Sequence, residues 1–167
     1  PELMRSHYER AMPDIDSPLV QQQQAWYLAR PDYLRRVVER SRRYMHHIIE
    51  ELEKRGMPTE LALLPIVESA YNPMAYSRAH ASGMWQFIPS TGRRYRLKSD
   101  AVRDERRNLE MSTEAAVKYL KYLKEFQEND WFMAMASYNA GEERVRKLLK
   151  GQNITDYWKM HGPRETM

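Results

Sequence analysis

The apolar residues of this chain recur at helical spacing over most of its length, and this pattern constrains the fold more than any other feature. In residues 31–55 they stand three or four positions apart, with arginine and glutamate on the opposite face. Pro31 suits the first turn of a helix and Gly56 suits its exit, so we predict one long helix from Pro31 to Arg55. Strand-like alternation is weak throughout, which predicts a mainly α-helical chain.

The same spacing predicts further helices. We expect them over Glu60 to Tyr71, Thr113 to Phe126, Trp131 to Asn139 and Glu142 to Lys150, with short ones in Leu19 to Arg30, Pro89 to Tyr95 and Thr155 to Met160. Thr59 and Ser112 are the expected N-caps. Pro65 should kink its helix or mark a new start. Residues 83–88 are apolar but too short to be assigned to helix or strand.

Length and composition narrow the class of protein. A chain of 167 residues favours one domain, or one domain plus an extension. We assign residues 1–30, rich in proline and glutamine, to an N-terminal extension and 31–167 to the domain. Hydrophobic residues make up 42%, which excludes a disordered chain. The net charge of +4 fits either a solvated basic surface or an anionic polymer partner. The sequence has no cysteine, no visible signal peptide and no apolar run long enough to span a membrane.

Glu68 stands alone in its stretch of sequence. It closes an apolar run, and no other acidic residue follows until Asp100. An isolated carboxyl group in apolar surroundings suits general acid chemistry, because burial disfavours the charged form. Five basic residues in the same stretch would lower its pKa, so spacing alone does not fix that value: Arg78, Arg93, Arg94, Arg96 and Lys98.

Two further motifs carry polar groups at apolar positions. In Gly83-Met84-Trp85-Gln86 an aromatic ring and an amide follow a glycine, which suits a sugar site; the alternative is a buried tryptophan beside a capping glutamine. At the end of an apolar helix, Tyr138 and Asn139 place two polar tips beside small residues; the alternative is an ordinary helix end.

Taken in order, these pieces resemble a known family. Glu68-Ser69, then the Gly-Met-Trp-Gln motif, then Tyr138-Asn139 are similar to the lytic transglycosylases of the soluble-type (SLT) family, glycoside hydrolase family 23, which is related to goose-type lysozyme. The resemblance is greatest to the membrane-bound lytic transglycosylase D branch and covers residues 31–167. The remaining stretches that carry it are Leu61 to Pro73, Ala75 to Ser77, Ala81 to Tyr95, Asp104 to Arg107, Tyr138 to Gly141 and Pro163 to Thr166.

The resemblance implies a lysozyme-like helical fold with a substrate groove and a particular reaction. Glu68 would protonate the oxygen that leaves when the β-1,4 bond between N-acetylmuramic acid and N-acetylglucosamine is cleaved. It would then act as base on the C6 hydroxyl of the muramoyl residue, giving a 1,6-anhydro product. An intramolecular nucleophile removes the need for the second carboxylate that ordinary glycosidases carry. By the same resemblance Tyr138 would orient Glu68, and the remaining sugar contacts would be Ser69, Ser77, Met84, Gln86 and Asn139.

Other expectations follow from the same resemblance. It implies peptidoglycan strands as partner and a bacterial periplasmic or envelope location, with no cofactor. Family members continue after Pro163 to Thr166 with a tyrosine-bearing segment that closes the groove, so we expect a catalytic domain shortened at its C-terminal end. None of the five histidines forms a metal-ligand motif, and His46-His47 point about 100° apart on a helix, so we predict no metal site.

Three rival hypotheses stay open at this point. A lysozyme-type hydrolase would need a second carboxylate, and Asp100, Asp104 and Glu105 are the candidates near in sequence. A non-catalytic peptidoglycan-binding scaffold would keep the fold without the reaction. A nucleic-acid-binding protein has only the positive charge in its favour, because no nucleic-acid motif is present.

Overall fold

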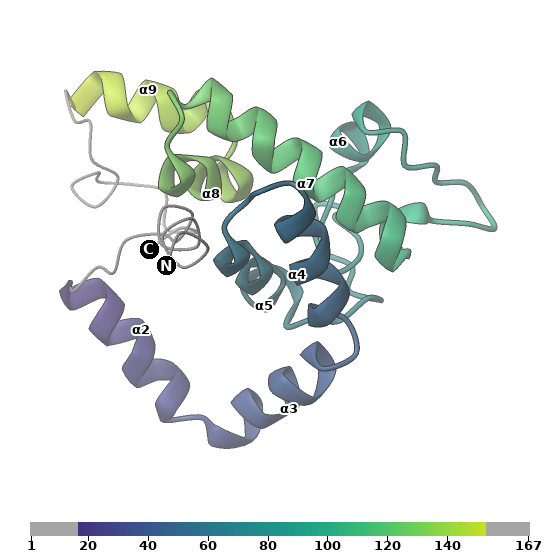
Figure 1. Cartoon of the computed structure of the whole chain (residues 1–167), viewed down its shortest axis with the longest axis horizontal. Helices are drawn as coiled ribbons and strands as arrows, with labels where there is room; N and C mark the ends of the chain where they lie inside the picture. Colours follow the sequence, from purple (N-terminus) through teal and green to yellow (C-terminus); the bar gives the residue numbers. More distant parts are fainter. Residues whose placement is uncertain (1–16, 153–167) are drawn as a thin grey trace, which may run out of the picture. The chain divides into compact units, whose positions relative to one another are not determined.

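The chain consists of short helices joined by ordered turns, and the computed structural model describes residues 17–152 (Figure 1). It divides into two compact units, residues 1–116 and 117–167. Isolated β-bridges are the one form of strand pairing in the described residues. The fold is mainly α-helical, as predicted. The predicted turn over Thr155 to Met160 lies outside the described residues.

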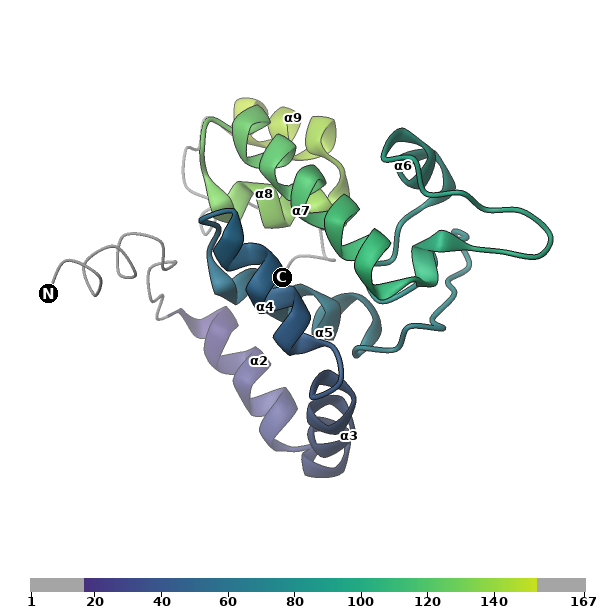
Figure 2. The same cartoon turned by 45° about the vertical axis from the view of Figure 1, so that its right-hand side comes forward.

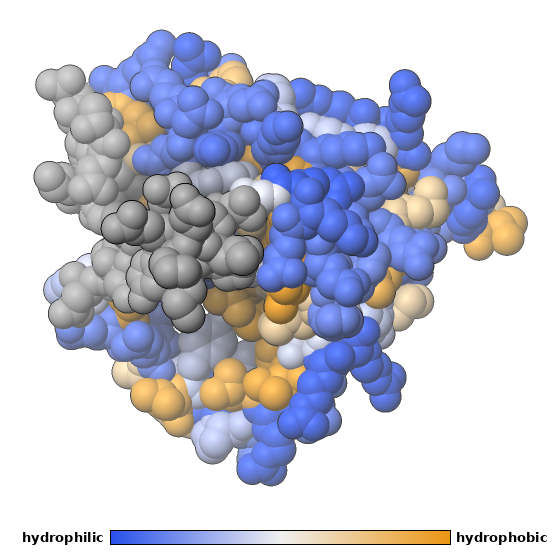
Figure 3. Space-filling view, viewed as in Figure 1, coloured by the Kyte–Doolittle hydropathy of each residue, from blue (hydrophilic) through white to orange (hydrophobic). Residues whose placement is uncertain are grey.

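The first unit begins with three helices. These are α2 (Pro18–Leu28), α3 (Pro31–Ser41) and α4 (Met45–Lys54). Ser17 caps α2 by accepting a hydrogen bond from the Val20 N–H at 3.2 Å. Figure 2 shows α2 and α3 meeting at a sharp turn, and Figure 3 shows mainly hydrophilic side chains over α4.

The single long helix predicted from Pro31 to Arg55 is wrong, because the chain turns between α3 and α4. Ser41 Oγ donates a hydrogen bond to the Val38 carbonyl at 2.8 Å, an arrangement that bends helices. The Tyr44 N–H then bonds to the Ser41 carbonyl in a tighter three-residue turn. The turn leaves Val37 and Ile48 buried in the core of this unit.

The next elements surround the candidate site. They are the 3₁₀ helix η1 (Thr59–Leu63), α5 (Leu64–Ser69), α6 (Pro89–Arg94) and the 3₁₀ turn η2 (Glu105–Arg107). Pro65 occupies the first turn of α5, so the predicted new start at this proline is confirmed. Thr59 is the first residue of η1 rather than its cap. Residues 83–88 form neither helix nor strand but a turn closed by the Ser82–Phe87 bridge.

Helix α7 (Leu109–Phe126) starts earlier than predicted, because Asn108 rather than Ser112 caps it. The Asn108 side-chain oxygen accepts a hydrogen bond from the Met111 N–H at 2.9 Å, and Ser112 is buried within the helix. The second unit also contains α8 (Trp131–Ala140) and α9 (Glu142–Gln152), which pack on each other (Figure 1). Their core is Met133, Ala136 and Val145, covered in part by Ala140, Leu148 and Leu149.

Candidate active site

Glu68 lies one residue before the end of α5, and a tightly built turn follows it. Ala70 and Tyr71 both adopt left-handed backbone conformations, with φ of 51° and 58°. Non-glycine residues rarely do so, and a bulky one needs strong support from its surroundings. The Tyr71 side chain is fully buried, and its hydroxyl donates to the Ala62 carbonyl of η1. The end of the helix that carries Glu68 is therefore anchored in the core.

The Glu68 side chain is half-buried, and one oxygen of its carboxyl group is buried without a partner among the described residues. Its Oε1 atom is buried and makes no hydrogen bond to any residue that the structure describes. Burial raises the pKa of Glu68 from its usual 4.5 to about 7. The basic residues of the stretch, which could have lowered this pKa, do not counter the effect of burial. The carboxyl group can therefore hold a proton near neutral pH, as a general acid must.

Ser69 joins α5 to the Gly-Met-Trp-Gln turn. Its hydroxyl lies 2.9 Å from the Met84 carbonyl oxygen and 3.2 Å from the Pro65 carbonyl oxygen. The structure thus brings two of the predicted site residues together across fifteen positions of sequence. The Met84 side chain is buried, so the contact runs through its backbone. Their role as sugar contacts stays a prediction.

Gln86 is held in place through one end of its amide. Its Nε2 atom donates to the Gly83 carbonyl at 2.8 Å and to the Ala75 carbonyl at 3.2 Å. The carbonyl end of the amide is therefore the acceptor that remains for a ligand. Ser77 has a local task, because its hydroxyl accepts a hydrogen bond from the Ala81 N–H at 3.1 Å and closes the preceding loop.

Trp85 is wholly buried, so the interpretation of its ring as a sugar platform is wrong. Its indole Nε1–H donates to the Thr113 hydroxyl of α7 at 3.2 Å. The alternative given above, a buried tryptophan, is correct. The ring anchors the turn to α7 and is not available to contact a ligand. A large ring that must also satisfy one N–H is well suited to such an anchoring position.

A buried arginine that the sequence did not single out fixes this turn from the other side. Arg106 Nη1 donates to the His80 carbonyl at 2.7 Å and to the Phe87 carbonyl at 2.9 Å. The Asp104 carboxylate pairs with the same guanidinium group through two hydrogen bonds of 2.9 Å. The two ends of the segment 80–87 are thus hydrogen-bonded to the same arginine, whose charge Asp104 balances. The one sequence feature that could have indicated this buried arginine is the charged run from Asp104 to Arg107, which is part of the family resemblance.

Gly83 approaches this arginine so closely that no side chain fits. Its φ is +84°, and a Cβ atom there would collide with the Arg106 carbonyl oxygen. We expect Gly83→Ala to lower the free energy of unfolding by about 2 kcal/mol or more, because strain and backbone displacement add. Urea unfolding measures the effect. Gly151→Ala is the matched control, since a Cβ atom there meets nothing within 4 Å and alanine favours the helix. An equal response in both variants would contradict the close packing.

Three carboxylates that could have served as the second catalytic carboxylate of a hydrolase make structural contacts instead. Asp100 Oδ1 accepts hydrogen bonds from the Val102 and Arg103 N–H groups, which lower the pKa of Asp100. Burial alone would raise the pKa of Asp104, but hydrogen bonds from Arg106 outweigh burial and lower it. Glu105 is buried and accepts from the Lys98 N–H at 2.7 Å. These contacts weigh against the lysozyme-type hydrolase.

Tyr138 and Asn139 lie near the end of α8, in the second unit. The Tyr138 ring is 5.4 Å from that of Tyr119, at a tilted angle. Asp130 caps α8 through hydrogen bonds from two N–H groups, and Gly141 ends it with φ of 89°. The predicted orientation of Glu68 by Tyr138 stays a prediction. In the described part of the chain no group of three or more acidic or histidine side chains is placed to hold a metal ion.

Comparison with known proteins decides the family. The transglycosylase SLT domain matches residues 46–161, which include both motifs and Glu68. The chain belongs to the transglycosylase SLT domain family. Its mainly α-helical structure is the lysozyme-like fold expected of an SLT domain.

The relatives of this SLT domain support the branch inferred from sequence. The membrane-bound lytic murein transglycosylase D of Escherichia coli K12 is 44% identical over 151 residues, covering 88% of this chain and 33% of that protein. The same protein of Escherichia coli O6:H1 matches equally well. A putative tributyltin chloride resistance protein of an Alteromonas species is 39% identical over 110 residues, covering 66% of this chain and 53% of that protein. The chain therefore spans about a third of the transglycosylases that it matches. No helix within residues 17–152 is long and apolar enough to cross a bilayer.

Proposed function

We propose that this SLT domain is the catalytic part of a peptidoglycan lytic transglycosylase that acts in the bacterial envelope, on the periplasmic side. Its substrate is the β-1,4 bond between N-acetylmuramic acid and N-acetylglucosamine. The names of the two Escherichia coli relatives support the activity and the envelope location. The observation that carries the proposal is a solitary carboxyl group whose pKa burial raises to about 7.

Glu68 serves the reaction twice. In the first step its proton passes to the glycosidic oxygen as the bond from that oxygen to C1 of the muramoyl residue breaks. In the second step the carboxylate accepts the proton of the C6 hydroxyl, whose oxygen bonds to C1. The proton count is restored, no water is consumed, and no second protein carboxylate is needed. Burial favours the protonated form that starts the reaction, and the structural tasks of Asp100, Asp104 and Glu105 fit the absence of a second acid.

The neighbouring residues prepare the substrate rather than react. Ser69 fixes the end of α5 against the Met84 carbonyl, and the free carbonyl end of Gln86 accepts from a sugar hydroxyl or acetamido N–H. Tyr138 and Asn139 complete the sugar contacts in this proposal. Such positioning lowers the entropic cost of bringing the C6 hydroxyl to C1.

Product mass distinguishes this reaction from hydrolysis. Digestion of purified sacculi should release muropeptides that are one water lighter than hydrolysis products, because the 1,6-anhydro ring forms in place of a reducing end. Mass spectrometry of the soluble products measures this. Reducing-end muropeptides alone would establish the lysozyme-type hydrolase instead. Background release by both the wild type and Glu68→Gln would establish the non-catalytic scaffold.

A further inference from the structure

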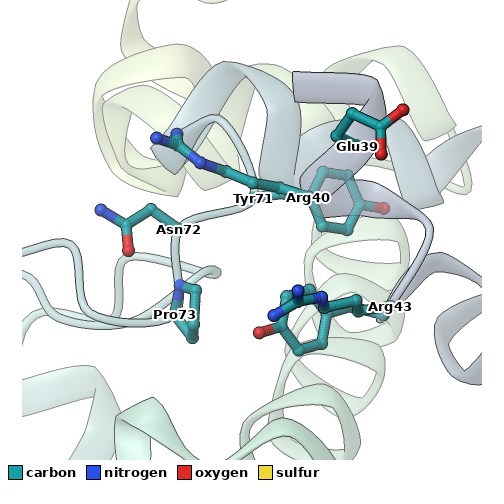
Figure 4. Close-up of a pocket in the computed structure, with 7 residues that line it drawn as sticks. Glu39, Arg40, Arg43, Tyr71, Asn72 and Pro73 are labelled. Carbon is teal, nitrogen blue, oxygen red and sulfur yellow. The ribbon is translucent and has the colours of Figure 1, made fainter. Parts of the chain in front are cut away.

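A pocket of about 350 Å³ opens where the end of α3 meets the segment after α5 (Figure 4). Arg40 and Arg43 extend from the α3 side toward the Asn72–Pro73 segment. Tyr71 also lines the pocket, three residues after Glu68 on the same chain segment.

The two arginines bring unused hydrogen-bond donors to the pocket. In the part of the chain that the structure describes, the Arg43 guanidinium makes no hydrogen bond or ion pair. Arg40 makes one long contact, from Nη1 to the Ala70 carbonyl at 3.5 Å. Most of the N–H groups of both side chains are thus available. A guanidinium group presents a rigid fork that matches a carboxylate.

Among the other polar groups of the pocket, Asn72 has used its acceptor and keeps its donors, whereas the Tyr71 hydroxyl has used its donor. Asn72 Oδ1 accepts from the Met74 N–H at 3.0 Å, which leaves the Asn72 amide N–H groups. The Tyr71 hydroxyl is committed to the Ala62 carbonyl. The one acid in the lining, Glu39, lies 3.6 Å from Arg42, which is not part of the lining. The pocket is therefore rich in donors and carries a positive balance.

We propose that this pocket binds a carboxylate of the peptide stem that N-acetylmuramic acid carries in peptidoglycan. The proposal rests on the proposed function, because it assumes that a muramoyl residue lies beside Glu68. Asn72 stands four positions after Glu68, so their Cα atoms are at most about 14 Å apart. A stem of four residues reaches about 13 Å when extended. The two lengths are comparable, so the stem of a sugar bound beside Glu68 can extend to the Asn72 side of the pocket, and the pocket would select strands that still carry their stems.

A matched pair of small ligands tests the recognition directly. N-acetylmuramoyl-L-Ala-D-Glu carries free carboxylates, its diamide is uncharged, and neither contains a bond that the enzyme cleaves. We expect the acid to bind the wild-type protein about tenfold more tightly than the diamide in calorimetric titration, with the difference shrinking at high salt. Equal affinities would overturn the proposal. Inorganic phosphate, as a third ligand, tests the alternative source: if phosphate binds as tightly as the peptide, the pocket is a general anion site and the proposal fails.

Variants then locate the site. Arg43→Gln should remove the preference for the acid, while Arg36→Gln, an exposed arginine of α3 outside the pocket, should keep it. Arg43 is exposed and has no partner to lose among the described residues, so the thermal unfolding midpoint should not change. A preference that survives in Arg43→Gln would place the recognition elsewhere and overturn the assignment.

Turnover separates this inference from the function on which it rests. Arg43→Gln should raise KM about tenfold on stem-bearing strands and leave both kcat and KM unchanged on strands stripped of their stems. If the variant reduced turnover of both substrates equally, the pocket would not recognise the peptide stem. If the wild type released no anhydro product from either substrate, the proposed function would fail, while the ligand pair would still decide whether the pocket binds a carboxylate.

Discussion

Replacing Glu68 with glutamine should reduce the release of anhydro-muropeptides by at least about 10³-fold. The amide keeps the shape of the side chain but can neither give a proton to the leaving oxygen nor take one from the C6 hydroxyl. General acid or base catalysis contributes about 10² to 10⁴ in rate, and here one residue supplies both. The rate of product release from sacculi, followed by chromatography and mass spectrometry, measures the loss.

Two companion variants make this result specific. Glu53→Gln removes an exposed carboxylate of α4 and should leave the rate unchanged. Glu68→Asp keeps an acid but withdraws it by one methylene, so it should retain more activity than Glu68→Gln while remaining far below the wild type. Activity of Glu68→Gln within a few-fold of the wild type would refute the catalytic role of this residue.

The local sequence predicted most helices because their signals are local. Apolar spacing and the flanking Asp130 and Gly141 mark α8, and Pro89 marks the start of α6. The break between α3 and α4 escaped prediction, since apolar residues keep helical spacing across it. At the break the Ser41 hydroxyl bonds to a carbonyl in the preceding turn, a contact that favours bending and that apolar spacing does not reveal.

The sequence predicted the acidic group of the candidate site but not the buried residues that hold the site in place. Glu68 stood out because an acid closing an apolar run is unusual, and the structure gives it the raised pKa that such chemistry needs. Arg106 did not stand out, because arginine normally lies at the surface. Its burial depends on the His80 and Phe87 carbonyls and on Asp104, a pairing that only the folded chain brings together. Trp85 is the opposite case. Its motif suggested a ring exposed to a sugar, but the folded chain buries that ring in the core.

The raised pKa of Glu68 also predicts that the catalytic group destabilises the fold at neutral pH. The folded protein holds the Glu68 proton up to about pH 7, whereas the unfolded chain releases it near pH 4.5. Between these values the folded state binds more protons, so the free energy of unfolding falls as pH rises. Below pH 4.5 the residue is neutral in both states and costs nothing. Above pH 7 the full penalty applies, about 3 kcal/mol.

Glu68→Gln removes this penalty, because an amide does not ionise. The variant should therefore unfold at higher urea concentration than the wild type at about pH 8, by about 3 kcal/mol, and the two should converge near pH 4. Glu53→Gln provides the baseline for the general effect of losing a carboxylate, and its difference from the wild type should stay small at every pH. A constant difference between Glu68→Gln and the wild type across this pH range would mean that Glu68 has an ordinary pKa. With an ordinary pKa the residue would be ionised at neutral pH, and the single-carboxylate reaction would lose the protonated acid on which its first step depends.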